Sequence, residues 1–519
     1  MQDLQDSSSP TRVLDSPELL ILVARHLNKR QVLSCLQVCR TWHKALISLF
    51  WHDVFIMDNR CPRAPVLRKY ADLVLRLIVH TEVFCWAPAE LQEISLPRLQ
   101  TLGVHQWNIN EAPKELHAPI KPLIKLITRH QSSLTNLGLR HVTSQELMNA
   151  VVGCSQLEVL RIDYLQLESL DLWLQQYESF WSRLRSLTVG GPWFTKLEED
   201  TSFTNPKLVE MLDANFGQSR LRSLDIRAVN KDILQIQSFL IQKSPELRDL
   251  RWRSTAGFED HGTPLALMAR SIQSGRFSQQ LETMFASGVE FNNSDLKLVL
   301  ESLKGLKTLD VQHTGFNVSS WLILKNEIPR YMTTLKSLSL AGCPHLTGKV
   351  IHDVLCSIES LETFHADYVK FSNLVEDERD WLCTGIKSLK MAIVMDGPQE
   401  EDDLMVMYRL SKLTRLELLD MRALCAQRTY NKKDVSRVVL LRGVMPTLAR
   451  GLEVLEGLTR MRFFGVCLER GLGWRLDETM WALHYWPRLN ELSGMKFYSS
   501  PVEICKKAGV RLTDCQLLL

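Results

Sequence analysis

The feature that most constrains the fold is an apolar triplet, spaced as L-x-x-L-x-L, that recurs along most of the chain. The first and last of fifteen candidate copies start at residues 74 and 489, which are 415 residues apart, so the fourteen intervals average about 30 residues. The candidates are Val74/Leu77/Val79, Leu99/Leu102/Val104, Leu134/Leu137/Leu139, Leu157/Leu160/Ile162, Leu184/Leu187/Val189, Leu221/Leu224/Ile226, Leu247/Leu250/Trp252, Leu281/Met284/Ala286, Leu306/Leu309/Val311, Leu335/Leu338/Leu340, Leu361/Phe364/Ala366, Ile386/Leu389/Met391, Leu413/Leu416/Leu418, Leu458/Met461/Phe463 and Leu489/Leu492. One copy could arise by chance, but fifteen indicate a repeat architecture.

The repeat predicts an α/β fold. Each triplet predicts a short strand whose apolar residues point into a core, and the segment after it, such as residues 348–357, predicts a helix that packs behind the strand. Stacked strands would form one parallel sheet on the concave face of a curved solenoid, with helices on the convex face. The pattern resembles irregular leucine-rich repeats, whose usual length is about 20 to 29 residues.

A different pattern precedes the repeats. Ser16, Pro17 and Glu18 suit the start of a helix, because serine caps, proline fits the first turn and glutamate favours the positive end of the helix dipole. Three apolar stripes follow, which predict three helices of about a dozen residues that must pack on one another to be stable. The stripes are Leu19, Leu20, Val23 and Leu27, then Val32, Leu33 and Leu36, then Trp42, Ala45, Leu46 and Leu49.

The segment from Ser16 to Trp51 resembles an F-box, whose usual pattern is Leu-Pro, two leucines after the proline, a Val-Cys-Arg-x-Trp core and a late Leu-Trp. The matching positions are Pro17, Leu19, Leu20, Val38, Cys39, Arg40, Trp42, Phe50 and Trp51. Ser16 and Phe50 depart from the pattern, since leucine is usual at both places. One repeat, with Cys343 after its strand, also resembles the cysteine-containing repeats common in F-box proteins.

This resemblance implies that the helices dock on a Skp-type adaptor and, through it, on a cullin. The residues expected to contact the adaptor are Pro17, Leu19, Leu20, Val23, Val38, Cys39, Trp42 and Trp51. A small helical unit with more apolar surface than it can bury internally needs a partner. The alternative is that the three helices only close the N-terminal end of the solenoid, because leucine stripes at helical spacing also form cores.

The predicted organisation has three parts. Residues 1–11 form a polar, disordered leader, residues 12–57 the F-box, and residues 58–519 the irregular solenoid. Insertions interrupt the solenoid, notably at about 420–457, where basic residues suggest a surface segment that could instead help to hold a target. The acidic run from Gln399 to Asp403 is expected to be a solvated loop.

Residues between the strand leucines point away from the core and carry any target-binding function. Arg227, Arg251, Arg253 and His365 are the candidates. The arginines could hold an acidic or phosphorylated segment of a target, because guanidinium groups match carboxylate and phosphate geometry. The alternative, which we favour, is a cross-strand charge ladder in which Asp225 and Asp249 neutralise them.

Charge and cysteine usage exclude several classes of function. With 62 basic and 59 acidic side chains, the net charge of +3 is too small to argue for nucleic acid or a membrane surface as a partner. The twelve cysteines lack zinc-ligand spacing and are expected to be reduced, and we predict no metal and no cofactor. The N-terminus lacks a signal sequence and no stretch reaches 18 apolar residues, so a cytoplasmic or nuclear location is expected.

No catalytic constellation is evident in the sequence. His352 beside Asp353 and His365 near Asp367 lack an accompanying nucleophile, phosphate-binding or metalloprotease motif, so we interpret them as structural or surface histidines and predict no enzyme activity. The resemblance favours a substrate-recognition subunit of a Skp–cullin–F-box ubiquitin ligase, of the kind found in large fungal receptor families. The alternative is a leucine-rich-repeat scaffold unattached to a ligase. The target, and any need for phosphorylation or a small molecule, stay open.

Overall fold

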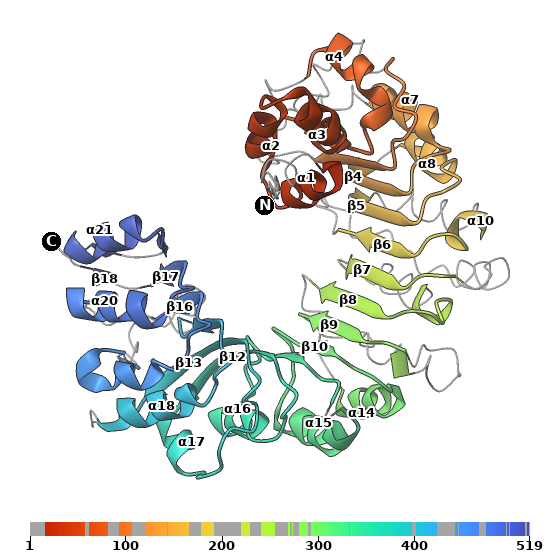
Figure 1. Ribbon diagram of the computed structural model, residues 1–519. Helices are drawn as coiled ribbons and strands as arrows, with labels where there is room; N and C mark the ends of the chain where they lie inside the picture. The colour runs from red at the N-terminus through yellow and green to blue at the C-terminus, as the bar shows by residue number, and fades with distance from the viewer. Residues whose placement is uncertain are drawn as a thin grey trace, which may run out of the picture. The chain divides into compact units, whose positions relative to one another are not determined.

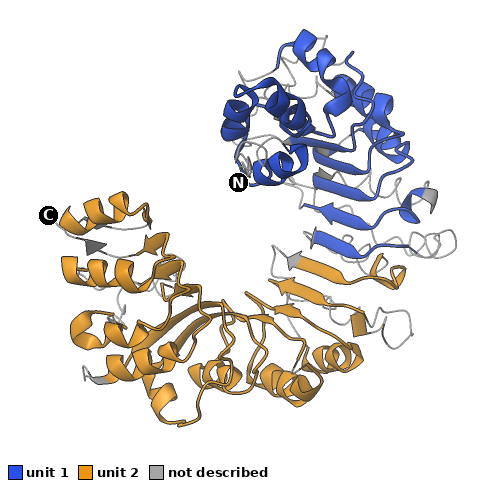
Figure 2. Ribbon diagram, in the orientation of Figure 1, with its two compact units in different colours: residues 1–226 blue, residues 227–519 orange. Residues whose placement is uncertain are grey.

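The computed structural model divides the chain into two units, residues 1–226 and 227–519, shown in Figure 2. The residues that it describes are 16–57, 62–80, 93–105, 120–142, 144–165, 178–190, 219–228, 240–254, 268–269, 272, 280–288, 292–331, 333–396, 401–422, 442–444, 446–466, 474–494, 496–497, 499–513 and 516–517. The predicted leader at 1–11, and residues 423–441 of the predicted insertion, lie outside these ranges.

Three helices open the first unit: α1 (Pro17–Ala24), α2 (Lys29–Leu36) and α3 (Arg40–His52). The predicted start is confirmed, because the Ser16 side chain accepts a hydrogen bond from the Leu19 amide at 3.4 Å. Asn28 and Gln31 cap α2 reciprocally. Helix α3 packs against both α1 and α2.

The helical unit continues into a parallel sheet (Figure 1). Strand β1 (Asp53–Ile56) begins directly after α3 and pairs with β2, with Val54 opposite Leu77. The strands that follow in order are β2 (Arg76–His80), β3 (Thr101–His105), β4 (Asn136–Val142), β5 (Val159–Leu165), β6 (Ser186–Val189) and β7 (Ser223–Ala228). The other helices described in this unit are α4 (Ala64–Lys69), η2 (Ala71–Leu73), α7 (Ile120–His130), α8 (Gln145–Val152) and α10 (Glu178–Trp181).

The second unit repeats the arrangement. Its strands are β8 (Asp249–Ser254), β9 (Thr283–Ser287), β10 (Thr308–Asp310), β11 (Ser337–Ser339), β12 (Thr363–Lys370), β13 (Ser388–Met395), β14 (Leu418–Asp420), β15 (Arg442–Gly443), β16 (Phe463–Gly465), β17 (Glu491–Ser493), β18 (Lys496–Phe497), β19 (Arg511–Thr513) and β20 (Gln516–Leu517). Its helices are α14 (Asn293–Ser302), α15 (Val318–Tyr331), α16 (Gly348–Leu355), α17 (Phe371–Val375), α18 (Glu401–Ser411), η4 (Leu448–Arg450), η5 (Leu452–Leu455), α20 (Leu476–Tyr485) and α21 (Ser499–Lys507). Figure 1 shows α14 to α18 along one face of strands β9 to β13.

The predicted fold class is confirmed: a helical N-terminal region precedes parallel strands that are backed by helices. Thirteen of the fifteen triplets place their middle residue in a strand, buried against the helical side. For the triplets that start at Leu413 and Leu458, the strand lies three residues later than predicted. The buried strand positions are Leu416/Leu419/Met421 and Met461/Phe464/Val466, because Leu419 pairs with Leu389 on one side and Phe464 on the other.

Five of the described strands were not predicted: β1, β15, β18, β19 and β20. Val54 and Ile56 of β1 extend the sheet at its first edge, where they lie opposite Leu77 and Val79 of β2. At the other end, Leu512 of β19 lies opposite Leu492. The repeat therefore begins within the last residues of the predicted F-box and continues to the last described part of the chain.

The prediction of a solvated loop at 399–403 is wrong for residues 401–403. Helix α18 includes Glu401 to Asp403, and the Asp403 carboxylate is fully buried, 2.9 Å from the Arg450 guanidinium. Arg450 belongs to η4, in the second half of the predicted insertion. Strand β15, from the same insertion, pairs antiparallel with β13. The described part of the insertion is therefore packed into the second unit.

Candidate functional site

The N-terminal helices have a small core and an exposed apolar surface. The core cluster consists of Leu20, Ala24, Val32, Leu36 and Leu46. Five other apolar side chains are 44 to 62% exposed: Leu19, Leu22, Val23, Leu33 and Val38. Leu19, Leu22 and Val23 lie at helical spacing i, i+3 and i+4, so they share one side of α1. This set of five, called the apolar face below, is the candidate docking surface.

The apolar face corrects the predicted helix stripe. Leu19 and Val23 were expected to be buried with Leu20 and Leu27, whereas the side of α1 that packs inward carries Leu20, Ala24 and Leu27. Leu22 and Leu33 of the face were not predicted as contacts. Ala24 was not recognised as part of the buried side of α1, because an alanine adds little to an apolar pattern.

The predicted adaptor contacts divide into two groups. Leu20 and Trp51 are buried, and Trp51 stacks on Tyr70 with ring centroids 4.9 Å apart, so these two stabilise the unit instead of presenting a surface. Pro17, Leu19, Val23, Val38 and Cys39 are exposed, and Trp42 is half-buried against the core. Cys39 caps α3, where its sulfur accepts a hydrogen bond from the Trp42 amide at 3.5 Å.

A lysine fastens the helices to the sheet. The Lys29 ammonium at the start of α2 donates to the Asp53 carbonyl at 2.5 Å. It also lies 5.1 Å from the centroid of the Phe50 ring and 5.7 Å from that of Phe55. Burial lowers the Lys29 pKa, and the nearby Asp53 carboxylate opposes the shift. The apolar face is therefore presented by a unit that is joined to the first strand by both backbone and side-chain contacts.

The predicted arginine cluster is represented by one described side chain. The backbones of Arg227 and Arg253 lie in β7 and β8, but their side chains are outside the described part of the structure. Arg251 Nε lies 3.4 Å from the Asp249 carboxylate, and its guanidinium carbon lies 4.7 Å from the centroid of the Phe285 ring. Neutralisation of Arg251 by Asp249 agrees with the favoured alternative, although the pair lies within one strand and not across two.

His365 lies on β12, on the face of the sheet opposite the helices, because its neighbours Phe364 and Ala366 are buried on the helical side. Its side chain is partly exposed. Burial lowers the His365 pKa, with the positive charge of Lys390 as the next cause. Neutral imidazole is therefore the favoured form at neutral pH.

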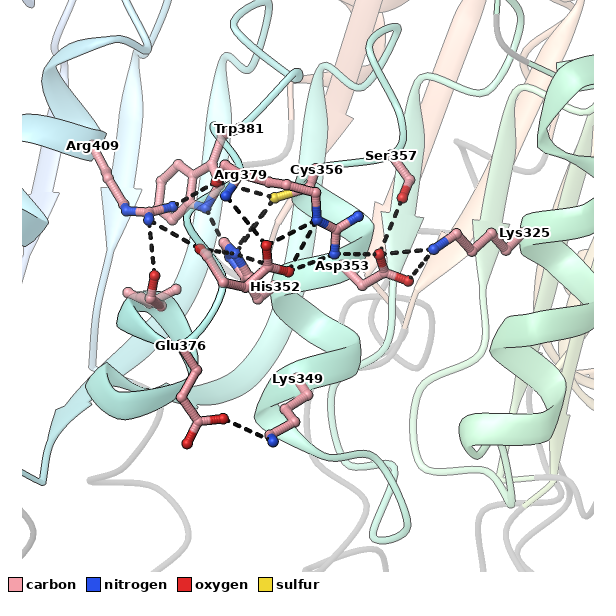
Figure 3. Close-up of polar contacts among 12 residues, drawn as sticks. Lys325, Lys349, His352, Asp353, Cys356, Ser357, Glu376, Arg379, Trp381 and Arg409 are labelled. Carbon is pink, nitrogen blue, oxygen red and sulfur yellow. Dashed lines mark hydrogen bonds and ion pairs between the residues drawn. The ribbon is translucent and has the colours of Figure 1, made fainter.

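The other predicted His/Asp neighbours belong to the helical side, as Figure 3 shows. His352 of α16 is buried, and its Nδ1 accepts a hydrogen bond from the Trp381 indole at 3.3 Å. Its Nε2 lies 3.5 Å from the Cys356 sulfur and 3.3 Å from the Asp377 carbonyl oxygen. Burial lowers the His352 pKa and raises that of Cys356 to about 11, so both groups are neutral near pH 7. A neutral thiol and imidazole form a packing contact here, not an activated nucleophile.

Within the described residues, no group of three or more His, Cys, Asp or Glu side chains is arranged to hold a metal ion. The helices described are too short or too polar to cross a membrane.

Comparisons with known proteins identify the N-terminal region. A family model described as F-box-like matches residues 17–57, so this part of the chain is an F-box-like domain. Comparison with curated proteins finds no match. Similar solved structures include the leucine-rich repeat-containing protein LegL7 of Legionella pneumophila, at 10% identity and TM-score 0.31, covering 64% of this chain and 93% of that one. A leucine-rich-repeat protein of Leptospira interrogans has 12% identity and TM-score 0.27, covering 89% of this chain and 93% of that one.

Proposed function

We propose that this chain is the substrate-recognition subunit of a Skp–cullin–F-box ubiquitin ligase. The observation that carries the proposal is the apolar face, five exposed apolar side chains inside the segment that the F-box-like model matches. The F-box-like domain docks on a Skp-type adaptor, which links it to a cullin, while the repeats hold a target protein. The chain itself is non-catalytic, uses no cofactor and acts in the cytoplasm or nucleus, as in fungal receptors of this type.

In this role the chain contributes proximity. Ubiquitin transfer is carried out by other subunits, and the receptor raises the local concentration of a target near them. The strand pairing of β1 with β2 and the Lys29 contacts support this role, since they join the docking domain to the repeats without a flexible segment between α3 and β1.

The test is retention of a purified Skp adaptor by the immobilised full-length chain. Val23→Asp together with Val38→Asp places two charges on the apolar face, and we expect at least a tenfold weaker interaction because both carboxylates would be desolvated on docking. Val66→Asp is the matched control, since Val66 is also an exposed valine of the first unit but lies outside residues 17–57. Leu20 is unsuitable for the test because its truncation would damage the core.

Absence of adaptor binding by the unmodified chain, or equal retention by the Val23/Val38 variant, would contradict the proposal. Circular dichroism of each variant separates loss of docking from loss of folding.

A second function is also compatible with the pairing of β1 and β2. Because β1 pairs with β2, the helical unit also covers one end of the sheet, as expected of a cap on a repeat scaffold without a ligase. On that hypothesis, no adaptor is retained and the Val23/Val38 variant keeps every partner of the unmodified chain.

A further inference from the structure

Three adjacent strands of the second unit carry a compact group of polar side chains on the face opposite the helices. We call it the donor cluster, and its members are Ser337 and Ser339 on β11, Thr363 and His365 on β12, and Ser388 and Lys390 on β13. The strand register places them in two rows of three, with Ser339 opposite His365 and His365 opposite Lys390. Buried Leu338, Phe364 and Leu389 alternate with them and point to the helical side.

The described residues supply no polar partner to the side chains of the cluster. Among the described residues, none of the six side chains has a hydrogen-bond or ion-pair partner. Ser339 is the most informative, because it is only 8% exposed and its hydroxyl is nevertheless unpartnered. Enclosed hydroxyl groups are normally hydrogen-bonded, so this one indicates an interaction that the described residues do not supply.

The carboxylates around the cluster are already occupied. Asp420, the register neighbour of Lys390, accepts hydrogen bonds at 2.8 Å from both Nε and Nη2 of Arg422. Asp367 accepts from the Gly342 amide at 2.9 Å. Asp310 accepts from the backbone and side-chain amides of Gln312 at 3.1 and 3.0 Å. Each acid near the cluster therefore has donors of its own.

Lys390 carries the positive charge of the donor cluster. It is exposed, and within the described ranges no carboxylate lies in ion-pair distance of it. The bidentate contact of Arg422 with Asp420 occupies the acid that the strand register sets beside Lys390. The hydroxyl groups and the neutral imidazole of the cluster, which can each donate a hydrogen bond, lie on the same three strands as Lys390. The cluster is thus complementary to an anion.

We propose that the donor cluster binds an anionic side chain of the target protein, a carboxylate or a phosphorylated hydroxyl. The inference rests on the proposed function, since it names the class of target segment that the repeats hold. Lys390 supplies the charge, and His365 and the hydroxyls supply donors that orient the anion. The donor cluster is separate from the predicted arginine cluster, in which Arg251 is paired with Asp249 and the side chains of Arg227 and Arg253 lie outside the described part of the structure.

The experiment uses the immobilised full-length chain and four pools of synthetic peptides with randomised flanks. The fixed central residue is glutamate, phosphoserine, serine or arginine. We expect the glutamate pool, the phosphoserine pool or both to be retained at least tenfold more than the serine and arginine pools, and the difference between the first two identifies the source of the anion. Lys390→Glu should reverse the preference in favour of the arginine pool.

Two further variants sharpen the result. Lys304→Glu is the matched control, because Lys304 is also exposed but lies between α14 and β10, outside the cluster. It should leave the preference unchanged. Thr363→Val keeps the shape and charge of the face while it removes one donor, and should weaken retention of the anionic pools about threefold to tenfold.

Equal retention of all four pools overturns the proposal, as does an unchanged preference in the Lys390→Glu variant. Adaptor retention, measured on the same preparations, reports on the proposed function separately. A chain that binds the adaptor but shows no anion preference refutes only the donor cluster, and one that selects anions but binds no adaptor refutes only the ligase role.

Discussion

Asp403→Asn is expected to loosen α18, because it removes the charge from a buried ion pair. Asp403 is fully buried 2.9 Å from Arg450, whose side chain is 19% exposed. Asparagine keeps the shape of the side chain, so the change tests the charge and not the packing. What remains is a guanidinium group held against a neutral amide at a site closed to water on the helix side.

The magnitude follows from the burial of the pair. Breaking a buried ion pair by removing one partner costs about 3 to 5 kcal/mol. Arg450 retains some contact with solvent, so we expect the lower end, about 3 kcal/mol. Asp380→Asn is the control, since the Asp380–Lys412 pair at 2.6 Å is exposed on both sides and such pairs contribute little.

Hydrogen exchange of peptides from α18, followed by mass spectrometry, measures the effect locally. A loss of about 3 kcal/mol corresponds to exchange that is more than a hundredfold faster, at about 1.4 kcal/mol per factor of ten. The Asp380 variant should exchange like the unmodified chain. If the two variants exchange at equal rates in α18, the ion pair does not stabilise the helix and the reasoning fails.

Three other changes test the fold. Leu224→Ala should lower the free energy of unfolding by about 2 to 5 kcal/mol, measured by chemical denaturation, with partly exposed Val159→Ala as a control that changes it much less. Hydrogen bonds from Lys336 and Lys387 lower the Glu362 pKa from 4.5 to about 2. The stabilisation that ionised Glu362 gives the folded state is therefore present above pH 4.5 and is lost toward pH 2. The difference in unfolding free energy between the unmodified chain and Glu362→Gln should shrink over that interval. Gly342→Ala should destabilise the second unit for two reasons: φ is +72°, and a Cβ would lie 2.1 Å from His313 Nδ1. Adding His313→Ala should restore the part of the melting temperature that is lost to this steric contact, and the part lost to the backbone conformation should remain lost.

The repeat was predictable from sequence wherever one frame of apolar residues was possible. Leu335, Leu338 and Leu340 leave no other choice, and the strand lies where the pattern predicts. Around Leu416 the leucines satisfy two frames three residues apart, and only the pairing of Leu419 with its neighbours selects the later one. Periodicity identifies a strand, but hydrogen-bonded register decides its phase.

The candidate sites were less predictable, because they depend on which charged and polar side chains are already ion-paired or hydrogen-bonded to other residues. Asp403 belongs to an acidic run that reads as solvated, and its partner is 47 residues away in sequence. Lys390 could not be singled out from the sequence, because the ion pair between Arg422 and Asp420, the register neighbour of Lys390, is visible only in the folded chain. The apolar face was partly foreseen: the family pattern marks Leu19 and Val38, and the apolar stripe of the first helix includes Val23. Leu20 and Trp51 are buried instead.

The passage from α3 into β1 also bears on how this protein can be recombined with others. The matched F-box-like segment ends at residue 57, yet its last residues already form β1, hydrogen-bonded to β2. In a chimera that exchanges residues 17–57, a foreign strand would have to pair with Leu77 and its neighbours in β2. A chimera that omits β1 would leave β2 as an open sheet edge, which is prone to intermolecular pairing. Because β2 is in turn paired with β3, any exchange near this junction has to preserve the register between the strands on either side of the cut.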